Sequence, residues 1–170
     1  MVVVFDGMVS TSYSQLYVTC GTGDPASPDE AFVGQSNGLA GGAVDGALFL
    51  VVGTHTGSIP VRVVVHDAPP PLGDWDEIVE VAFAPASPAV FLSGWGENPS
   101  ARFDLTAPAY RARWSASGMD AAHDRVADET TPALDRYELA LWPQPASPDA
   151  IVRRTGPRAA YWHDAGFFRG

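Results

Sequence analysis

The sequence has no lysine and a single cysteine, Cys20, among its 170 residues. One cysteine excludes an intrachain disulfide and a cysteine metal cluster, and it favours a reducing compartment, so we expect a cytoplasmic protein. The chain also has no apolar run close to the roughly 20 residues that a membrane-spanning helix needs. Its first residues, MVVVFDG, lack a basic region and a long hydrophobic region, so no signal peptide and no membrane association are expected.

Positive charge is scarce, because arginine supplies all of it and the formal net charge is −10. Nucleic-acid-binding proteins need a basic surface, so this balance argues against direct nucleic-acid binding. Solubility alone would explain such a charge, but the charge also permits a basic protein partner. It is unevenly spread, because residues 151–170 contain four arginines and a single acidic residue.

A convincing helical period is absent, whereas many short runs alternate between apolar and polar residues. Residues 110–117 would place Tyr110, Ala112, Trp114 and Ala116 on one face of a strand and Arg111, Arg113, Ser115 and Ser117 on the other. This period of two predicts a half-buried antiparallel strand. We therefore expect Trp114 in the core and the two arginines in solvent.

Similar β-prone runs recur along the chain at 12–20, 46–53, 59–66, 75–83, 89–95, 101–105 and 136–142. Their spacing predicts an all-β fold, a mostly antiparallel β-sandwich of about eight or nine strands, and a jelly-roll-like form is compatible with the same pattern. The length fits one domain. We expect residues 1–170 to form it, with 143–170 as a Pro-rich and Arg/aromatic C-terminal extension packed on the body.

Catalytic motifs are lacking as well. There is no GxSxG elbow, and Cys20 lies in a strand pattern, where a buried inert thiol is expected. Asp74, Asp76, Glu77 and Glu80 offer carboxylate pairs of the kind that glycosidases use. In a strand, however, Asp76 and Glu80 mark the solvent face, so no enzymatic activity is predicted.

The best metal candidates are Asp120, His123 and Asp124, whose spacing of three and four residues suits one helical turn. They match neither a zinc motif nor a calcium loop. A solvated acidic loop is the simpler interpretation, and we predict no metal and no cofactor.

Two surface features remain. Acidic residues gather in 118–135, where Asp120, Asp124, Asp128, Glu129 and Asp135 are opposed by Arg125. Such a loop is often only solvated, but it would also steer a basic protein toward the chain. Among the five tryptophans, Trp95 in GWGEN is the one that we expect to be exposed. An exposed tryptophan on a β-sandwich suggests a carbohydrate-binding module as an alternative function.

Several short segments resemble the competence protein J family, the inhibitors of DNA-entry nuclease. They are YSQLYV at 13–18, GLAGGAVDGALFL at 38–50, FDL at 103–105 leading to Tyr110 and Trp114, His123-Asp124, and the strand start at Asp135–Tyr137. The resemblance implies a cytoplasmic β-sandwich that inhibits a nuclease by binding it. The chain departs from the family in the 67–75 proline linker and in the segment after about 143.

The leading hypothesis is therefore a non-enzymatic protein that binds a basic protein such as a nuclease. The candidate partner-binding residues are Asp120, His123, Asp124, Asp128, Glu129 and Trp95.

Overall fold

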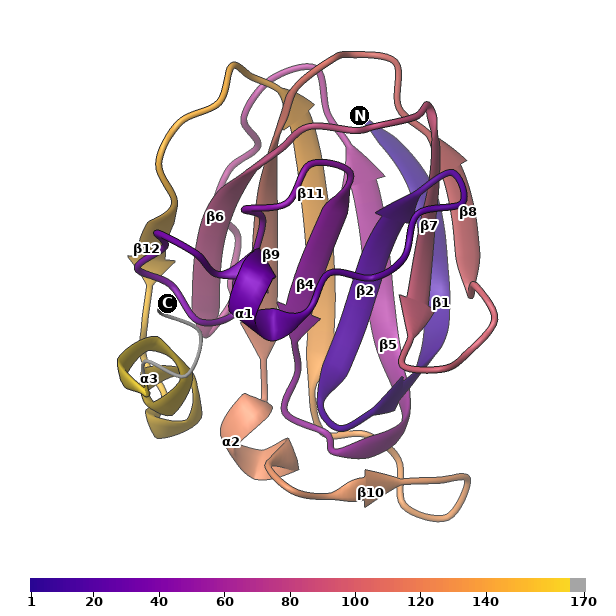
Figure 1. Cartoon of the computed structure of the whole chain (residues 1–170). Helices are drawn as coiled ribbons and strands as arrows, with labels where there is room; N and C mark the ends of the chain where they lie inside the picture. The colour runs from indigo at the N-terminus through magenta and orange to yellow at the C-terminus, as the bar shows by residue number, and fades with distance from the viewer. Residues whose placement is uncertain (166–170) are drawn as a thin grey trace.

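Strands dominate the computed structural model, which describes residues 1–165 (Figure 1). The last residues of the C-terminal extension that we expected to pack on the body, 166–170, lie outside the described residues. The strands are β1 (Val2–Ser12), β2 (Gln15–Cys20), β3 (Ala40–Gly41), β4 (Ala47–Val51), β5 (Thr56–Val65), β6 (Glu77–Phe83), β7 (Ala89–Gly94), β8 (Ala101–Asp104), β9 (Tyr110–Ser117), β10 (Val126–Ala127), β11 (Arg136–Pro143) and β12 (Ala150–Arg153). The helices are α1 (Pro28–Ala31), α2 (Met119–Ala122) and α3 (Pro157–Asp164).

Backbone hydrogen bonds join the 12 strands of the described chain into one mixed sheet. Its main path runs β12-β6-β9-β11-β5-β1-β2-β4-β3, with β7 and β8 branching from β2 and β10 beside β5. Most neighbours are antiparallel, but β10 and β11 run parallel to β5. The β class is confirmed, whereas the sandwich and jelly-roll forms are not, because the strands belong to one continuous open sheet. The 12 strands exceed the expected eight or nine, partly because β3 and β10 have two residues each and show no period.

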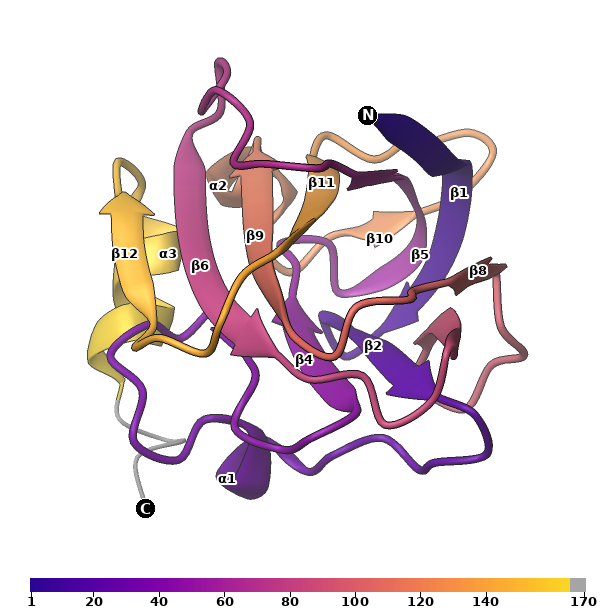
Figure 2. The same ribbon diagram turned by 90° about the horizontal axis from the view of Figure 1, so that it is seen from above.

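The sheet folds over so that β2 and β4 lie across the face of β9, β11 and β5 (Figures 1 and 2). Apolar side chains from both parts form one core, which includes Leu16, Val18, Leu48, Leu50, Val63, Val81, Leu139 and Leu141. Trp114 is 1% exposed, stacks on Tyr137 and donates its indole N–H to the Val51 carbonyl at 3.1 Å. The predicted burial of Trp114 is confirmed.

The outer face of β9 is covered too, which the sequence did not predict. Arg111 and Arg113 are both buried. The Arg113 guanidinium donates to the carbonyl of Pro70 at 2.8 Å, and that of Arg111 donates to the carbonyl of Pro148 at 2.8 Å. The prediction of solvent-facing arginines is wrong because two proline-containing segments, which no period reveals, fold over this face.

Glu80 is a further correction on the same face. Its carboxylate accepts the Nε–H of Arg111 at 3.1 Å and that of Arg113 at 2.8 Å. The Glu80 side chain is only 15% exposed. Glu80 therefore does not mark a solvent face but neutralises part of a buried cationic pair.

Two sets of contacts join the chain after β11 to the loop before β3. Asp149 accepts the backbone N–H groups of Ser36 and Asn37 at 2.9 and 2.7 Å. The buried His163 of α3 accepts the N–H of Gly38 through Nδ1 at 3.0 Å. None of the helices in residues 1–165 is long and apolar enough to cross a membrane.

Candidate protein-binding site

The acidic loop begins at Gly118, the residue before α2. Gly118 has a φ of 81°, and a Cβ there would lie 2.1 Å from the Leu134 carbonyl oxygen. Only glycine accepts both the left-handed backbone and this close approach. Gly57 in β5 also allows a close approach, because a Cβ there would lie 1.9 Å from the Ala127 carbonyl oxygen. These two glycines let the loop and β10 lie directly against the sheet.

Asp120 accepts a hydrogen bond from the first turn of α3. Its Oδ1 accepts the backbone N–H of Arg158 at 2.8 Å, and Glu77 beside it accepts the N–H groups of Thr155 and Gly156 at 3.1 and 2.6 Å. Carboxylates are favourable at a helix N-terminus, because they meet unpaired N–H groups and the positive end of the dipole. Asp120 therefore has a structural role in addition to its exposure.

His123 and Asp124 form an exposed pair after α2. The His123 Nδ1 lies 3.1 Å from the Asp124 carboxylate, and these side chains are 40% and 66% exposed. Asp124 has a φ of 57°, which Asp and Asn tolerate better than most residues. Within residues 1–165, no group of three or more His, Cys, Asp or Glu side chains is arranged to hold a metal ion.

Asp128 and Glu129 form the turn that follows β10. Asp128 accepts the hydroxyl and backbone N–H of Thr130 at 2.7 and 2.8 Å and the N–H of Thr131 at 2.8 Å. These hydrogen bonds lower the pKa of Asp128, and the bond from the Thr130 hydroxyl has the largest effect. Its carboxylate is thus charged at neutral pH, and Glu129 next to it is exposed.

Asp135 does not belong to this surface, although the sequence grouped it with the acidic loop. It is 2% exposed and accepts the N–H and hydroxyl of Thr54 at 2.9 and 2.6 Å. The Tyr137 hydroxyl donates to it at 2.6 Å and accepts the N–H of Gly53 at 2.6 Å. This buried network fixes the β4–β5 connection to the start of β11.

An aromatic group lies at the same end of the molecule as the acidic loop. Trp95 is 53% exposed, as predicted, and meets Tyr13 edge to face at 5.3 Å; Tyr13 in turn meets His55 at 5.6 Å. We call Tyr13, His55, Trp95 and Val126 the tip surface. The β1–β2 turn, the β4–β5 connection, α2 and β10 are all at the lower end in Figure 1, with the β7–β8 turn at the lower right.

Tyr13 was not predicted as a surface residue, because 12–20 was predicted to be one strand. In the structure β1 ends at Ser12 and β2 begins at Gln15, so Tyr13 and Ser14 form a two-residue turn. Both have a φ of 58°. Such turns usually carry Asn or Gly, and neither is present here to signal the turn.

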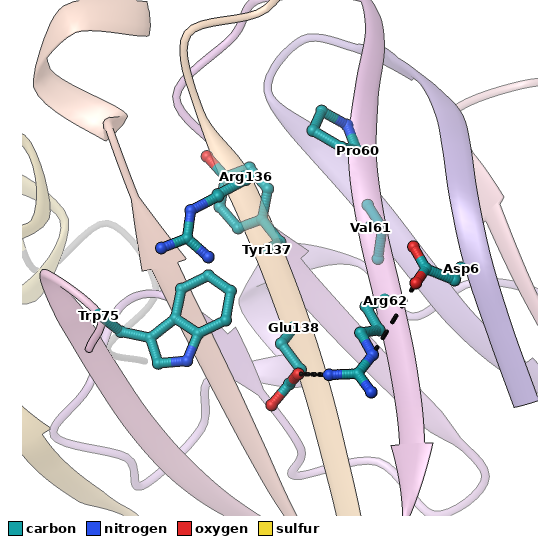
Figure 3. Close-up of a pocket in the computed structure, with 8 residues that line it drawn as sticks. All are labelled: Asp6, Pro60, Val61, Arg62, Trp75, Arg136, Tyr137 and Glu138. Carbon is teal, nitrogen blue, oxygen red and sulfur yellow. Dashed lines mark hydrogen bonds and ion pairs between the residues drawn. The ribbon is translucent and has the colours of Figure 1, made fainter. Parts of the chain in front are cut away.

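A shallow groove lies on the outer face of the sheet between β1 and Trp75 (Figure 3). Arg62 lies 3.1 Å from Glu138 and 3.9 Å from Asp6, and Arg136 stacks on Trp75 at 4.2 Å. The two carboxylates that line this groove, Asp6 and Glu138, are both paired with Arg62.

Comparisons with known proteins show the fold. No family model matches the chain, and no curated protein sequence matches it. Among solved structures, ComJ from Bacillus subtilis, an inhibitor of the DNA degrading activity of NucA, aligns with a TM-score of 0.62 and 17% identity, covering 84% of this chain and 98% of ComJ. The product of crocagin biosynthetic gene J aligns with a TM-score of 0.57 and 16% identity, covering 82% of this chain and 96% of that protein. This chain therefore shares the fold of ComJ, which confirms the resemblance to the competence protein J family at the level of the fold.

Proposed function

We propose that this chain is a non-enzymatic, cytoplasmic protein that binds and inhibits a nuclease, with its acidic loop facing a basic surface of that nuclease. The observation that carries the proposal is the match to ComJ, which extends over 98% of the inhibitor. The net charge of −10 and the exposed carboxylates of Asp124, Asp128 and Glu129 support a basic partner.

Three of the four carboxylates that the sequence offered for acid–base catalysis have structural partners, which favours a non-enzymatic role. Glu80 is bound by Arg111 and Arg113, and Glu77 is bound by the backbone before α3. Asp76 accepts the N–H of Gly118 at 2.9 Å.

The exposed carboxylates give a test of the electrostatic part. Association with a catalytically inactive, immobilised nuclease, either NucA or a DNA-degrading nuclease of the source organism, is measured by interferometry at low and high salt. The double variant Asp124→Asn/Glu129→Gln should associate about threefold to tenfold more slowly at low salt, because steering is lost. Asn is compatible with the positive φ at residue 124, so the loop should keep its shape.

The matched control is Asp24→Asn/Asp45→Asn, which makes the same change in net charge at two exposed positions outside the acidic loop. It should slow association much less. Equal rates for both double variants, or rates that salt does not change, would contradict a role for the acidic loop.

Carbohydrate binding is the second candidate, favoured by the 53% exposure of Trp95. Tyr13 meets this ring at an interplanar angle of 83°, so the two rings do not form one flat platform for a sugar. Titration with a panel of glycans would quench or shift tryptophan fluorescence if this function is correct. An unchanged spectrum across the panel would remove it.

A further inference from the structure

The tip surface concentrates exposed apolar side chains. Tyr13, Trp95 and Val126 are 57%, 53% and 58% exposed. Tyr13 lies between Trp95 and His55, with ring centroids 5.3 and 5.6 Å away. Exposed apolar side chains that gather at one end of a monomer often mark an interaction site.

The backbone beneath these rings is held in place. Tyr13 and Ser14 both adopt the left-handed conformation, which costs free energy for a residue with a Cβ. The Ser14 N–H donates to the His55 carbonyl at 3.0 Å, and the Val52 N–H donates to the Ser14 carbonyl at 3.0 Å. Tyr13 therefore projects from a fixed turn, so little conformational entropy of the backbone would be lost when a partner binds it.

Strand register brings the backbone next to Tyr13, His55 and Val126 together. Thr56 of β5 pairs with Ser12 on one side and with Val126 on the other, and the N–H of His55 donates to the Arg125 carbonyl at 2.9 Å. The turn after Trp95 and the loop before Val126 each carry an exposed acid, Glu97 and Asp124. The apolar centre thus has Glu97, Asp124 and the exposed Arg125 at its edge, and the net negative charge of this edge fits a basic protein surface with an apolar cleft.

Other exposed groups are less suited to this role. In the groove of Figure 3, Arg62 is occupied by Glu138 and Asp6, and Arg136 is held on Trp75. The groove has both signs of charge, so it offers no complementarity to a basic partner.

We propose that Tyr13 and Trp95 are the anchor residues of the partner interface, and that they insert into an apolar cleft on a basic nuclease. This inference rests on the proposed function. Aromatic residues in the centre of an interface commonly carry most of the binding energy, while charges at the edge mainly affect association.

The test measures the Kd for an inactive form of a nuclease that the chain inhibits in a DNA-degradation assay. Tyr13→Asn removes the ring but suits a positive φ, so the turn should remain folded. Tyr13→Asn and Trp95→Ala should each raise Kd by about 30-fold or more, mainly through faster dissociation. Tyr161→Ala, which changes an exposed tyrosine on α3, should change Kd by less than about threefold.

Hydrogen exchange of the complex supplies an independent readout. Amides of residues 13–16 and 94–97 should become protected on binding. Inhibition that persists with Kd values within threefold of wild type in both tip variants, or with no protection of these segments, would overturn the anchor role while leaving the proposed function intact. Failure of the chain to inhibit any of the nucleases tested would overturn the proposed function and this inference with it.

Discussion

Glu80 is the residue on which the outer face of the sheet depends. Its carboxylate lies between the guanidinium groups of Arg111 and Arg113, whose side chains are 7% and 6% exposed. Removing the carboxylate charge would leave two buried cations without their anion. We expect Glu80→Gln to lower the free energy of unfolding by about 3–5 kcal/mol, measured by urea denaturation.

The control for this variant is Asp104→Asn, which breaks the exposed pair between Arg102 and Asp104. That change should cost less than about 1 kcal/mol. If the two variants lose similar stability, the cluster around Glu80 contributes no more than a surface ion pair.

Tyr137 links stability to alkaline pH. Burial, followed by the negative charge of Asp135, raises the pKa of Tyr137 well above the ordinary value for tyrosine. The Tyr137 hydroxyl therefore ionises less readily in the folded state than in the unfolded state. Its contribution to the free energy of unfolding is complete below pH about 10, and it declines as the pH rises from the unfolded-state pKa toward the folded-state pKa. Tyr137→Phe should lower stability at pH 8 by about 1–3 kcal/mol, because Asp135 loses a buried donor.

The pH dependence separates this effect from simple packing. Between pH 10 and 11 the stability difference between wild type and Tyr137→Phe should shrink, by up to about 1.4 kcal/mol per pH unit. Tyr13→Phe, at an exposed tyrosine, is the control and should give a small difference that stays constant. A constant difference for Tyr137→Phe as well would show that its hydroxyl ionises in the folded protein as easily as in the unfolded one.

At the scale of elements, α3 is attached through its two ends. Glu77 and Asp120 bind the backbone at its start, and His163 binds the Gly38 N–H near its end. We expect Glu77→Gln to loosen α3 by about 1–3 kcal/mol, because a charged acceptor is lost. Hydrogen exchange of α3 amides should then be about tenfold to a hundredfold faster, with amides of β9 and β11 unchanged.

Glu97→Gln, at an exposed acid in the β7–β8 turn, is the matched control and should leave exchange in α3 unchanged. Equal acceleration in α3 and in the sheet after Glu77→Gln would mean that Glu77 supports the whole domain rather than this helix.

Individual elements differ in how far the sequence could predict them. The alternation in 110–117 predicted β9 and the burial of Trp114, because an inward face of apolar residues is a local signal. The eight-residue helix α3 has no such local pattern, because many of the contacts that stabilise it come from residues distant in sequence. The turn at Tyr13 was missed for a related reason, because its unfavourable backbone is imposed by β1 and β2 pairing with their neighbours.

At the scale of the whole molecule, the alternation and spacing of short β-prone runs predicted the β class but could not predict which strands pair. The parallel contact between β5 and β11 joins residues that are far apart in sequence, and no local pattern encodes it.

Prediction of the candidate site from the sequence has the same limit. The sequence predicted exposed Trp95 and Asp124, but it could not separate them from Asp135, whose burial depends on Thr54 and Tyr137.

Inhibition of a nuclease is the central proposal, and a titration of DNA degradation tests it most directly. A fixed concentration of NucA, or of a DNA-degrading nuclease from the source organism, is mixed with increasing amounts of this chain, and cleavage of a fluorogenic DNA duplex is followed. The proposal predicts that the cleavage rate falls to background near stoichiometric amounts for at least one of these nucleases. Unchanged cleavage by every one of them at a tenfold excess of the chain would contradict it.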